Sequence, residues 1–277
     1  MKTTILGSTG LLGKTLMRAW SGDEVSGLGS RDADIRDARK MREVVKTTRP
    51  DWIVLAAAYT DVDGCESNQD LAFAVNRDGA VNVAHAAKEA GARLLFLSSD
   101  YVFDGRKTSP YETDDRRNPQ SVYGRSKAEA ELRLLDAMPG CCIARTSWLF
   151  GTGGKCFPDT ILKLAATRPA LDVVNDQRGC PTYAADLAEA IIQLCRANAS
   201  GIVHATNSGD CTWFEFAREV VHGGGLQTEV RPVNSAQMAR PAPRPAYSVL
   251  SPKSLQGFGI TTPTWQDALR RYLQARG

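Results

Sequence analysis

The stretch Thr3-Thr4-Ile5-Leu6-Gly7-Ser8-Thr9-Gly10-Leu11-Leu12-Gly13 decides the fold class of this chain. A short apolar run, typical of a buried strand, leads into glycines spaced G-x-x-G-x-x-G, and Leu12, Leu16 and Trp20 then recur at helical spacing. Glycines between a strand and a helix N-terminus let the backbone approach a pyrophosphate. The stretch therefore predicts a dinucleotide-binding turn, with a tight turn that binds no ligand as the alternative.

Strand and helix patterns continue to alternate over the first half of the chain. We expect strands at 24–28, 51–55, 93–97 and 141–145, and helices at 38–48, 71–90 and 122–136. Regular alternation of this kind is typical of an α/β protein with a doubly wound parallel sheet, here a Rossmann-like one.

The pattern loosens after Gly151. Helices are expected at 158–167 and 184–197 and a strand at 202–205, whereas 230–252, which holds five of the 13 prolines, is expected to be irregular. We therefore predict a smaller, discontinuous substrate-binding lobe. The predicted dinucleotide-binding domain is 1–150 plus about 184–206, and the predicted lobe is about 151–183 and 207–277.

Composition narrows the class of function. The 277 residues include 34 basic and 31 acidic side chains, and this balance predicts neither a nucleic-acid partner nor a membrane surface. The start of the chain has no signal-peptide pattern, and the seven cysteines form no C-x-x-C pair. We expect a reduced, cytoplasmic protein. The three histidines lack metal-ligand spacing, so no metal site is predicted.

The residues that follow the second expected strand indicate which nicotinamide cofactor the protein prefers. Many NAD-binding sheets carry Asp or Glu there, which accepts hydrogen bonds from the ribose hydroxyls. This chain has Gly29-Ser30-Arg31 instead, and a guanidinium suits a 2′-phosphate. The sequence favours NADP over NAD, and a solvated loop cation is the alternative for Arg31.

A tyrosine and a lysine one helical turn apart are the candidate catalytic pair. Tyr123 and Lys127 lie at i and i+4 of an expected helix, on one face. An ammonium about 5 Å from a phenol contributes roughly 3 kcal/mol at an effective dielectric near 20, about two pKa units. Such spacing also arises by chance on helices. Ser99, at the carboxyl end of a predicted strand, makes the set more specific because ligands bind at that edge.

Taken together, these motifs resemble the extended short-chain dehydrogenase/reductase family, and within it the dTDP-4-dehydrorhamnose reductases. The stretches that carry the resemblance are Gly7 to Gly13, Ala56 to Asp63, Ser98 to Gly105, Tyr123 to Lys127, Arg145 to Gly151, Asp176 to Thr182 and Arg244 to Leu250. They follow the family's order over almost the whole chain.

The resemblance implies reduction of the C4 ketone of a dTDP-6-deoxyhexulose by NADPH. Tyr123 would protonate the new alkoxide, Lys127 would hold the nicotinamide ribose and depress the phenol pKa, and Ser99 would orient the carbonyl. The implied cofactor-binding residues are Gly7, Thr9, Gly10, Leu11, Leu12, Gly13, Arg31, Asp34, Ile35, Ala56, Ala57, Ala58, Thr60, Asn76, Tyr123 and Lys127. The implied substrate-binding residues are Ser99, Asp100, Tyr101, Val102, Trp148, Gln177, Pro181, Thr182 and Arg244.

Three positions depart from patterns in related proteins. Thr15 stands where some relatives have a magnesium-binding glutamate, which makes magnesium doubtful. Cys180 replaces a usually apolar or small residue and hints at an altered sugar pocket. Asp100-Tyr101 lacks the Asp-Glu pair of nucleotide-sugar dehydratases, which argues against dehydration.

Other interpretations of the resemblance remain open. One is a non-catalytic NADP-binding subunit similar to the regulatory subunit of methionine adenosyltransferase, and another is a different 4-ketosugar substrate. A homodimer is also compatible with the resemblance.

Overall fold

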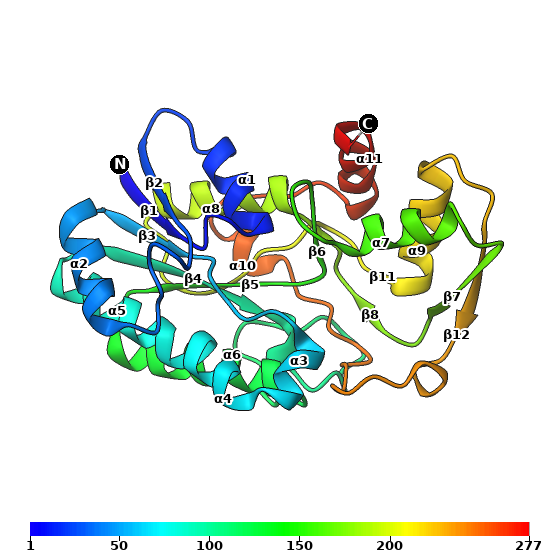
Figure 1. The fold of residues 1–277 in the computed structure, drawn as a ribbon, viewed down its shortest axis with the longest axis horizontal. Coiled ribbons are helices and arrows are strands. Elements are labelled where there is room, and N and C mark those ends of the chain that lie inside the picture. The colour runs from blue at the N-terminus through cyan, green and yellow to red at the C-terminus, as the bar shows by residue number, and fades with distance from the viewer. Residues whose placement is uncertain (277) are drawn as a thin grey trace.

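A parallel sheet of six strands, in the order β10-β5-β4-β3-β1-β2, forms the centre of the larger part of the protein (Figure 1). The computed structural model describes residues 1–276. The strands are β1 (Lys2–Leu6), β2 (Glu24–Leu28), β3 (Trp52–Leu55), β4 (Arg93–Ser99), β5 (Cys142–Thr146) and β10 (Gly201–His204). Every neighbouring pair is parallel, so the predicted doubly wound α/β class is confirmed.

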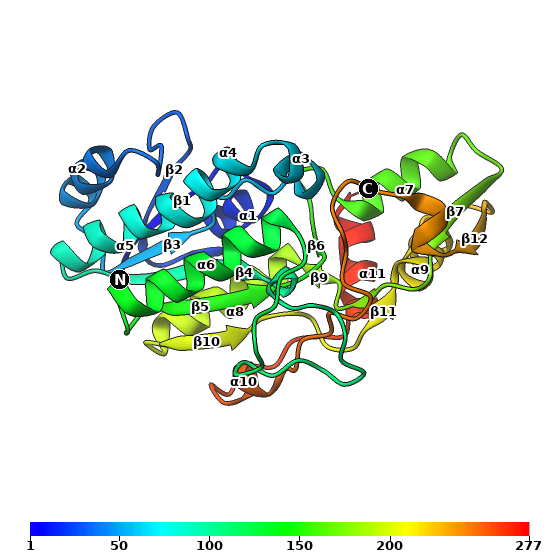
Figure 2. The same ribbon diagram turned by 90° about the horizontal axis from the view of Figure 1, so that it is seen from below.

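Helices cover both faces of this sheet because successive strand residues point to opposite sides (Figures 1 and 2). The covering helices are α1 (Leu11–Ala19) and α8 (Ala184–Arg196) on one side, with α2 (Ala38–Thr48), α5 (Gly79–Glu89) and α6 (Val122–Ala137) on the other. Val54 belongs to the core under α1 and α8, while Ile53 and Leu55 belong to the core under α2, α5 and α6.

The strand order places a ligand-binding crevice beside β1. The chain first adds β2 on one side of β1 and then adds β3, β4, β5 and β10 in turn on the other side, so the direction of strand addition reverses at β1. Open α/β sheets bind ligands at the carboxyl ends of the strands at such a reversal. The glycine turn follows β1 and Ala56 follows β3, so both stretches meet at this point.

The expected long helix at 71–90 contains an interruption. Its helical turns run through α4 (Gln69–Phe73), a π-helical turn η1 (Ala74–Asp78) and α5, and α3 (Val62–Ser67) precedes them. Asn76 lies in the π turn, where its side chain accepts a hydrogen bond from the Tyr59 backbone at 2.8 Å and donates one to Ser126 Oγ at 2.9 Å. The amide thus fastens the interrupted helix to α6.

The second part of the protein has its own apolar core (right-hand side of Figure 1). Its main elements are α7 (Phe157–Ala165), β7 (Ala170–Val174), α9 (Trp213–Gly223), β12 (Glu229–Val233) and α11 (Trp265–Arg276). Shorter elements are η2 (Asp100–Val102), β6 (Leu149–Phe150), β8 (Arg178–Gly179), β9 (Thr182–Tyr183), β11 (Cys211–Thr212), η3 (Ser235–Met238) and α10 (Lys253–Gln256). The division into domains stays a prediction.

The expectation that 230–252 is irregular is wrong at its start. Glu229–Val233 is a strand that pairs in parallel with β7, although it contains Pro232. The pair forms a separate two-stranded sheet, and proline is tolerated in such an edge strand because one side needs no donor.

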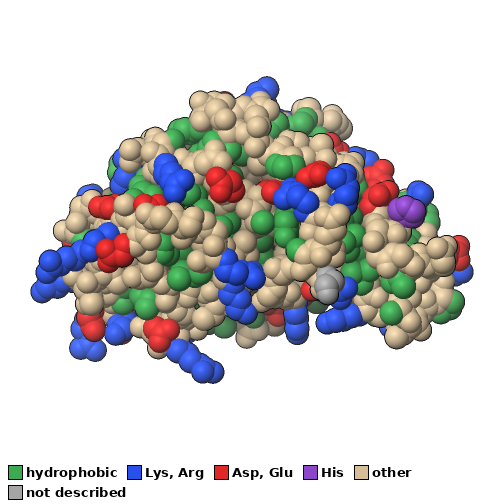
Figure 3. Space-filling view, turned by 90° about the horizontal axis from the view of Figure 1, so that it is seen from above, with side chains coloured by type: hydrophobic (Ala, Val, Ile, Leu, Met, Phe, Trp, Pro, Cys, Tyr) green, Lys and Arg blue, Asp and Glu red, His purple; other side chains and the backbone are tan. Residues whose placement is uncertain are grey.

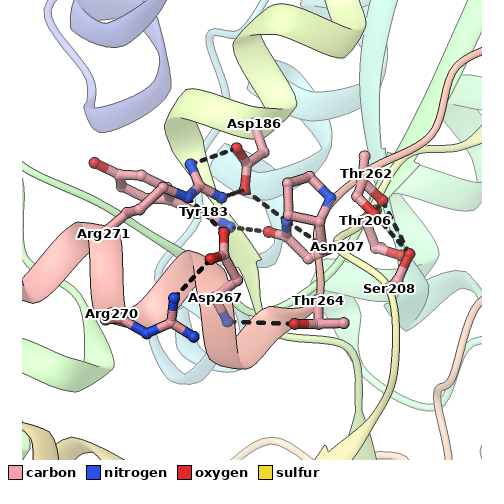
Figure 4. A network of polar contacts seen from close by, with 11 residues as sticks. Tyr183, Asp186, Thr206, Asn207, Ser208, Thr262, Thr264, Asp267, Arg270 and Arg271 are labelled. Atoms are coloured by element: carbon pink, nitrogen blue, oxygen red, sulfur yellow. Dashed lines mark hydrogen bonds and ion pairs between the residues drawn. The ribbon is translucent and has the colours of Figure 1, made fainter.

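A polar network ties α11 to α8 (Figure 4). The Arg271 guanidinium donates to both carboxylate oxygens of Asp186 at 2.8 and 2.7 Å. Asn207 donates to Asp186 Oδ2 at 2.6 Å and accepts from the Tyr183 backbone N–H at 2.7 Å. This network fixes the chain between β9 and α8, where it passes from the lobe back to the sheet.

The molecular surface carries both signs of charge. Basic and acidic side chains are interspersed over the face shown in Figure 3. Within residues 1–276, the helices are too short or too polar to cross a membrane.

Candidate active site

The glycine turn after β1 is packed too closely for other residues at two of its positions. A Cβ on Gly7, whose φ is +91°, would lie 2.5 Å from the Ala57 backbone nitrogen, and one on Gly13 would lie 2.1 Å from the Gly7 carbonyl oxygen. Gly10 caps α1 without any side-chain hydrogen bond. The first N–H groups of α1 therefore remain available to an anion.

A central cavity of about 410 Å³ opens beside this turn. It collects residues from the ends of β1, β3, β4 and β5 and from the start of α6. The predicted site residues that line it are Gly7, Gly10, Leu11, Leu12, Gly13, Ala56, Ala58, Thr60, Ser99, Asp100, Tyr101, Tyr123, Lys127 and Trp148. The glycine turn and the candidate catalytic residues thus share one cavity.

An edge cavity of about 320 Å³ lies on the β2 side of the turn. The predicted residues along it are Gly7, Thr9, Gly10, Asp34, Ile35, Ala56, Ala57 and Ala58. Ser30 lines the edge cavity but the exposed Arg31 does not, and Arg36, which sequence reasoning missed, does. The Arg36 guanidinium is engaged by both oxygens of Asp34.

Ser99 and Asp100 form a buried pair at the end of β4, exposed by 6% and 1%. Ser99 Oγ donates to Asp100 Oδ1 at 2.9 Å, while Asp100 Oδ2 has no hydrogen-bond partner within residues 1–276. Burial raises the pKa of Asp100 to about 6, against the opposing effect of the nearby Ser248 and Ser99 hydroxyls. The pair can offer a hydroxyl and a carboxyl oxygen to a polar ligand.

Tyr123 and Lys127 line the same cavity but do not show the expected electrostatics. Burial raises the pKa of the Tyr123 phenol above its usual range, and a hydrogen bond with Ser99 only partly opposes this. Burial lowers the pKa of Lys127 to about 7. The amine is therefore only partly protonated at neutral pH, whereas an exposed lysine is almost fully protonated. The expected depression of the phenol pKa is therefore wrong for these side chains, because burial raises this pKa and the neighbouring Asp100 raises it further.

Lys127 is bound to strand β4, and a buried ion cluster anchors the helix that carries it. Lys127 Nζ donates to the Leu97 carbonyl at 2.5 Å and lies 4.0 Å from the centre of the Phe96 ring. One turn further along α6, the fully buried Glu131 accepts from Ser98 Oγ at 2.5 Å and from Arg145 Nη2 at 2.7 Å. These contacts anchor α6 to the end of β4.

A lobe cavity of about 340 Å³ adjoins the central one through Tyr101, which lines both. Gln177 and Arg244 are the other predicted residues in its wall. Sequence reasoning missed Phe157, Thr160, Ile161, Leu164, Asp172, Val173, Val174, Trp213 and Met238. Arg240, from the same proline-rich segment as Arg244, also lines this cavity. A capping box, Thr212 to Glu215, is the signal that could have located α9 and hence Trp213.

Trp148 and Trp213 join the two cavities. The rings stack with their centres 3.5 Å apart and their planes 7° apart. Trp148 lines the central cavity with a left-handed backbone, φ +47°, and Trp213 lines the lobe cavity.

Five predicted residues line none of these three cavities: the exposed Arg31 and the buried Asn76, Val102, Pro181 and Thr182. Thr182 Oγ1 donates to the Cys180 carbonyl, as does Ser147 Oγ at 2.6 Å, so this stretch supports the segment that carries Trp148.

Thr15 offers a poor site for a magnesium ion. Its hydroxyl donates to the Leu11 carbonyl at 3.0 Å and carries no charge. Magnesium prefers carboxylates and phosphates as ligands.

Comparison with known proteins identifies the family. The chain matches the family model described as RmlD substrate binding domain over residues 1–276. The chain belongs to this family. It is 42% identical to the spore coat polysaccharide biosynthesis protein SpsK of Bacillus subtilis, covering 99% of this chain and 98% of that one. It is also 42% identical to a dTDP-4-dehydrorhamnose reductase of Mycobacterium tuberculosis, covering 99% and 93%.

A solved structure of a relative has the same fold. The dTDP-4-dehydrorhamnose reductase of Bacillus anthracis, described in complex with NADP, superimposes with a TM-score of 0.97 at 35% identity and 99% coverage of both chains. The resemblance predicted from the motifs is confirmed.

Proposed function

We propose that this protein reduces the C4 ketone of a dTDP-6-deoxyhexulose with NADPH and forms dTDP-L-rhamnose or a related deoxysugar nucleotide. One observation carries the proposal: Ser99, Tyr123 and Lys127 share a cavity with the glycine turn that suits a dinucleotide pyrophosphate. Family membership and the names of the relatives support the same reaction class.

The side chains can perform the proton transfer that such a reduction needs. When bound, NADPH supplies the hydride. The Tyr123 hydroxyl would protonate the developing alkoxide: the phenol carries its proton at neutral pH, and an alkoxide is a stronger base than a phenolate. Ser99 Oγ would hold the substrate oxygen. Lys127 would hold the nicotinamide ribose and supply positive charge beside the phenol when protonated.

Preference for NADPH over NADH is part of the proposal. The NADP complex of the Bacillus anthracis relative supports it. Arg31, an exposed side chain outside the edge cavity, is our candidate for the 2′-phosphate, and Arg31→Ala should raise the KM for NADPH more than that for NADH.

A panel of nucleotide-4-ketosugars, followed at the nicotinamide absorbance band, tests the proposal. We expect the fastest turnover with a dTDP-4-keto-6-deoxysugar. Tyr123→Phe should lower kcat by about 10²-fold or more, in line with loss of a general acid, while NADPH affinity stays within about twofold. Near-normal turnover in this variant would remove Tyr123 from the mechanism.

A matched control is the half-buried Tyr59, which lies outside the central cavity; Tyr59→Phe should keep normal turnover. A wild-type chain that binds NADPH and reduces no ketosugar would favour the regulatory-subunit alternative. The homodimer, the cytoplasmic location and independence from magnesium stay predictions.

A further inference from the structure

Two arginines from one segment line the lobe cavity, and their surroundings differ. Arg240 and Arg244 both lie in the loop that follows η3 and crosses toward α3. Either guanidinium could pair with an anionic ligand, because the planar donor fork matches phosphate oxygens. The question is which of the two still has donors to offer.

Arg244 is already engaged by the protein. Its Nη1 and Nη2 donate to the two carboxylate oxygens of Asp63 at 2.6 and 2.9 Å, and Nη1 also donates to the Ala242 carbonyl at 2.6 Å. The Ala242 backbone N–H donates to the same carboxylate at 3.1 Å. Arg244 and Tyr101 both line the lobe cavity, where the guanidinium lies near the phenol. With its side chain only 17% exposed, Arg244 is fixed in place and its charge is neutralised.

Arg240, by contrast, is exposed and only loosely paired. Its closest approach to an acidic group is 3.6 Å, from Nη1 to Asp63 Oδ2, which is beyond a good hydrogen bond, and its side chain is 60% exposed. No hydrogen bond of its guanidinium to another part of residues 1–276 is present. Two guanidinium charges facing the Asp63 carboxylate leave a single net positive charge there, and the free donors that carry it belong to Arg240. The exposed Asp172 lines the same cavity but forms no ion pair with either arginine within residues 1–276.

We propose that Arg240 pairs with the diphosphate of the nucleotide sugar, whereas Arg244 is a positioning residue that binds the loop to Asp63 of α3. This inference rests on the proposed function, and it reverses the expectation that Arg244 contacts the substrate. The ligand chemistry is that of a nucleoside diphosphate, whatever its base.

Binding of dTDP and of thymidine to the full chain, measured by calorimetry, tests the assignment without turnover. Arg240→Met should weaken dTDP binding by about tenfold, the size of a lost charge-assisted hydrogen-bond pair, and leave thymidine binding unchanged. The salt dependence of dTDP binding should fall as well. Arg231→Met is the matched control, because Arg231 is equally exposed, at 57%, and does not line the cavity. A dTDP affinity within twofold of wild type in Arg240→Met would overturn the inference.

Arg244→Met separates positioning from contact. It should lower the melting temperature and weaken dTDP and thymidine by the same factor, because it releases the loop. A loss confined to dTDP at an unchanged melting temperature would instead make Arg244 the contact and overturn the assignment.

Asp63→Asn tests the sign of the charge effect. Asp63→Asn loosens the same loop contact as Arg244→Met, but it also removes a negative charge that faces the anion. The ratio of dTDP affinity to thymidine affinity should therefore stay equal or rise in the folded variant. Weaker dTDP binding with thymidine binding retained would contradict the inference. A wild-type chain that binds dTDP and thymidine equally would overturn it too, whereas failure to reduce any ketosugar would overturn only the proposed reaction.

Discussion

The central cavity and the lobe cavity share Tyr101, yet their ionisable groups are perturbed in opposite ways. In the central cavity, burial raises the pKa of Asp100 to about 6 and lowers that of Lys127 to about 7, so both move toward their neutral forms. At the lobe cavity, the hydrogen bond from Arg244 lowers the pKa of Asp63 to about 2 and fixes its charge. Desolvation thus sets the pKa values in the central cavity, and ion pairing sets that of Asp63 beside the lobe cavity.

The largest expected effect comes from the ion cluster behind the central cavity. Glu131 and Arg145 are both fully buried, and Glu131 also accepts from Arg117 Nε at 2.5 Å. Glu131→Gln leaves the Arg145 charge buried without compensation and should lower the free energy of unfolding by about 3–5 kcal/mol. Chemical denaturation measures this loss.

Glu129→Gln on the same helix is the control. Glu129 pairs with Arg77 at 3.0 Å but is 43% exposed, so its loss should cost about 0–1 kcal/mol. Equal losses in the two variants would mean that burial does not set the strength of these pairs.

An intermediate effect is expected where the two cavities meet. A Cβ on Gly179 would lie 2.6 Å from Trp148 Cε2, which is itself stacked on Trp213. Gly179→Ala should therefore displace the indole, cost about 1–3 kcal/mol and raise the KM for the sugar nucleotide more than it lowers kcat. Gly140→Ala, at a position with no neighbour within 4 Å, is the matched control. An unchanged KM in Gly179→Ala would show that Trp148 does not shape the substrate site.

The central cavity could be predicted from the sequence better than the lobe cavity could. The glycine turn and the Tyr123–Lys127 pair act through spacings of a few residues, which local periodicity reveals. Asp63 and Arg244 are 181 positions apart, and no local pattern brings them together. The lobe cavity likewise joins α7, α9 and the loop after η3, whose approach depends on tertiary packing. The pKa of Tyr123 was mispredicted for a related reason: spacing gives a neighbour, but it does not give the depth of burial.

The smallest effect is a pH dependence that only the central cavity should show. The pKa of Lys127 lies near 7, well below its usual 10.5, so between these values the unfolded state binds a proton that the folded state does not. The penalty for burying the ammonium is fully present below pH 7 and disappears as the pH rises. Relative to Lys127→Met, the wild-type free energy of unfolding should therefore rise by about 1 kcal/mol per pH unit between pH 7 and 9. Lys163→Met, which removes an exposed lysine of α7, should leave the wild-type slope unchanged. Parallel curves for wild type and Lys127→Met would mean that the lysine remains charged in the fold, and desolvation would then not distinguish the central cavity from the lobe cavity.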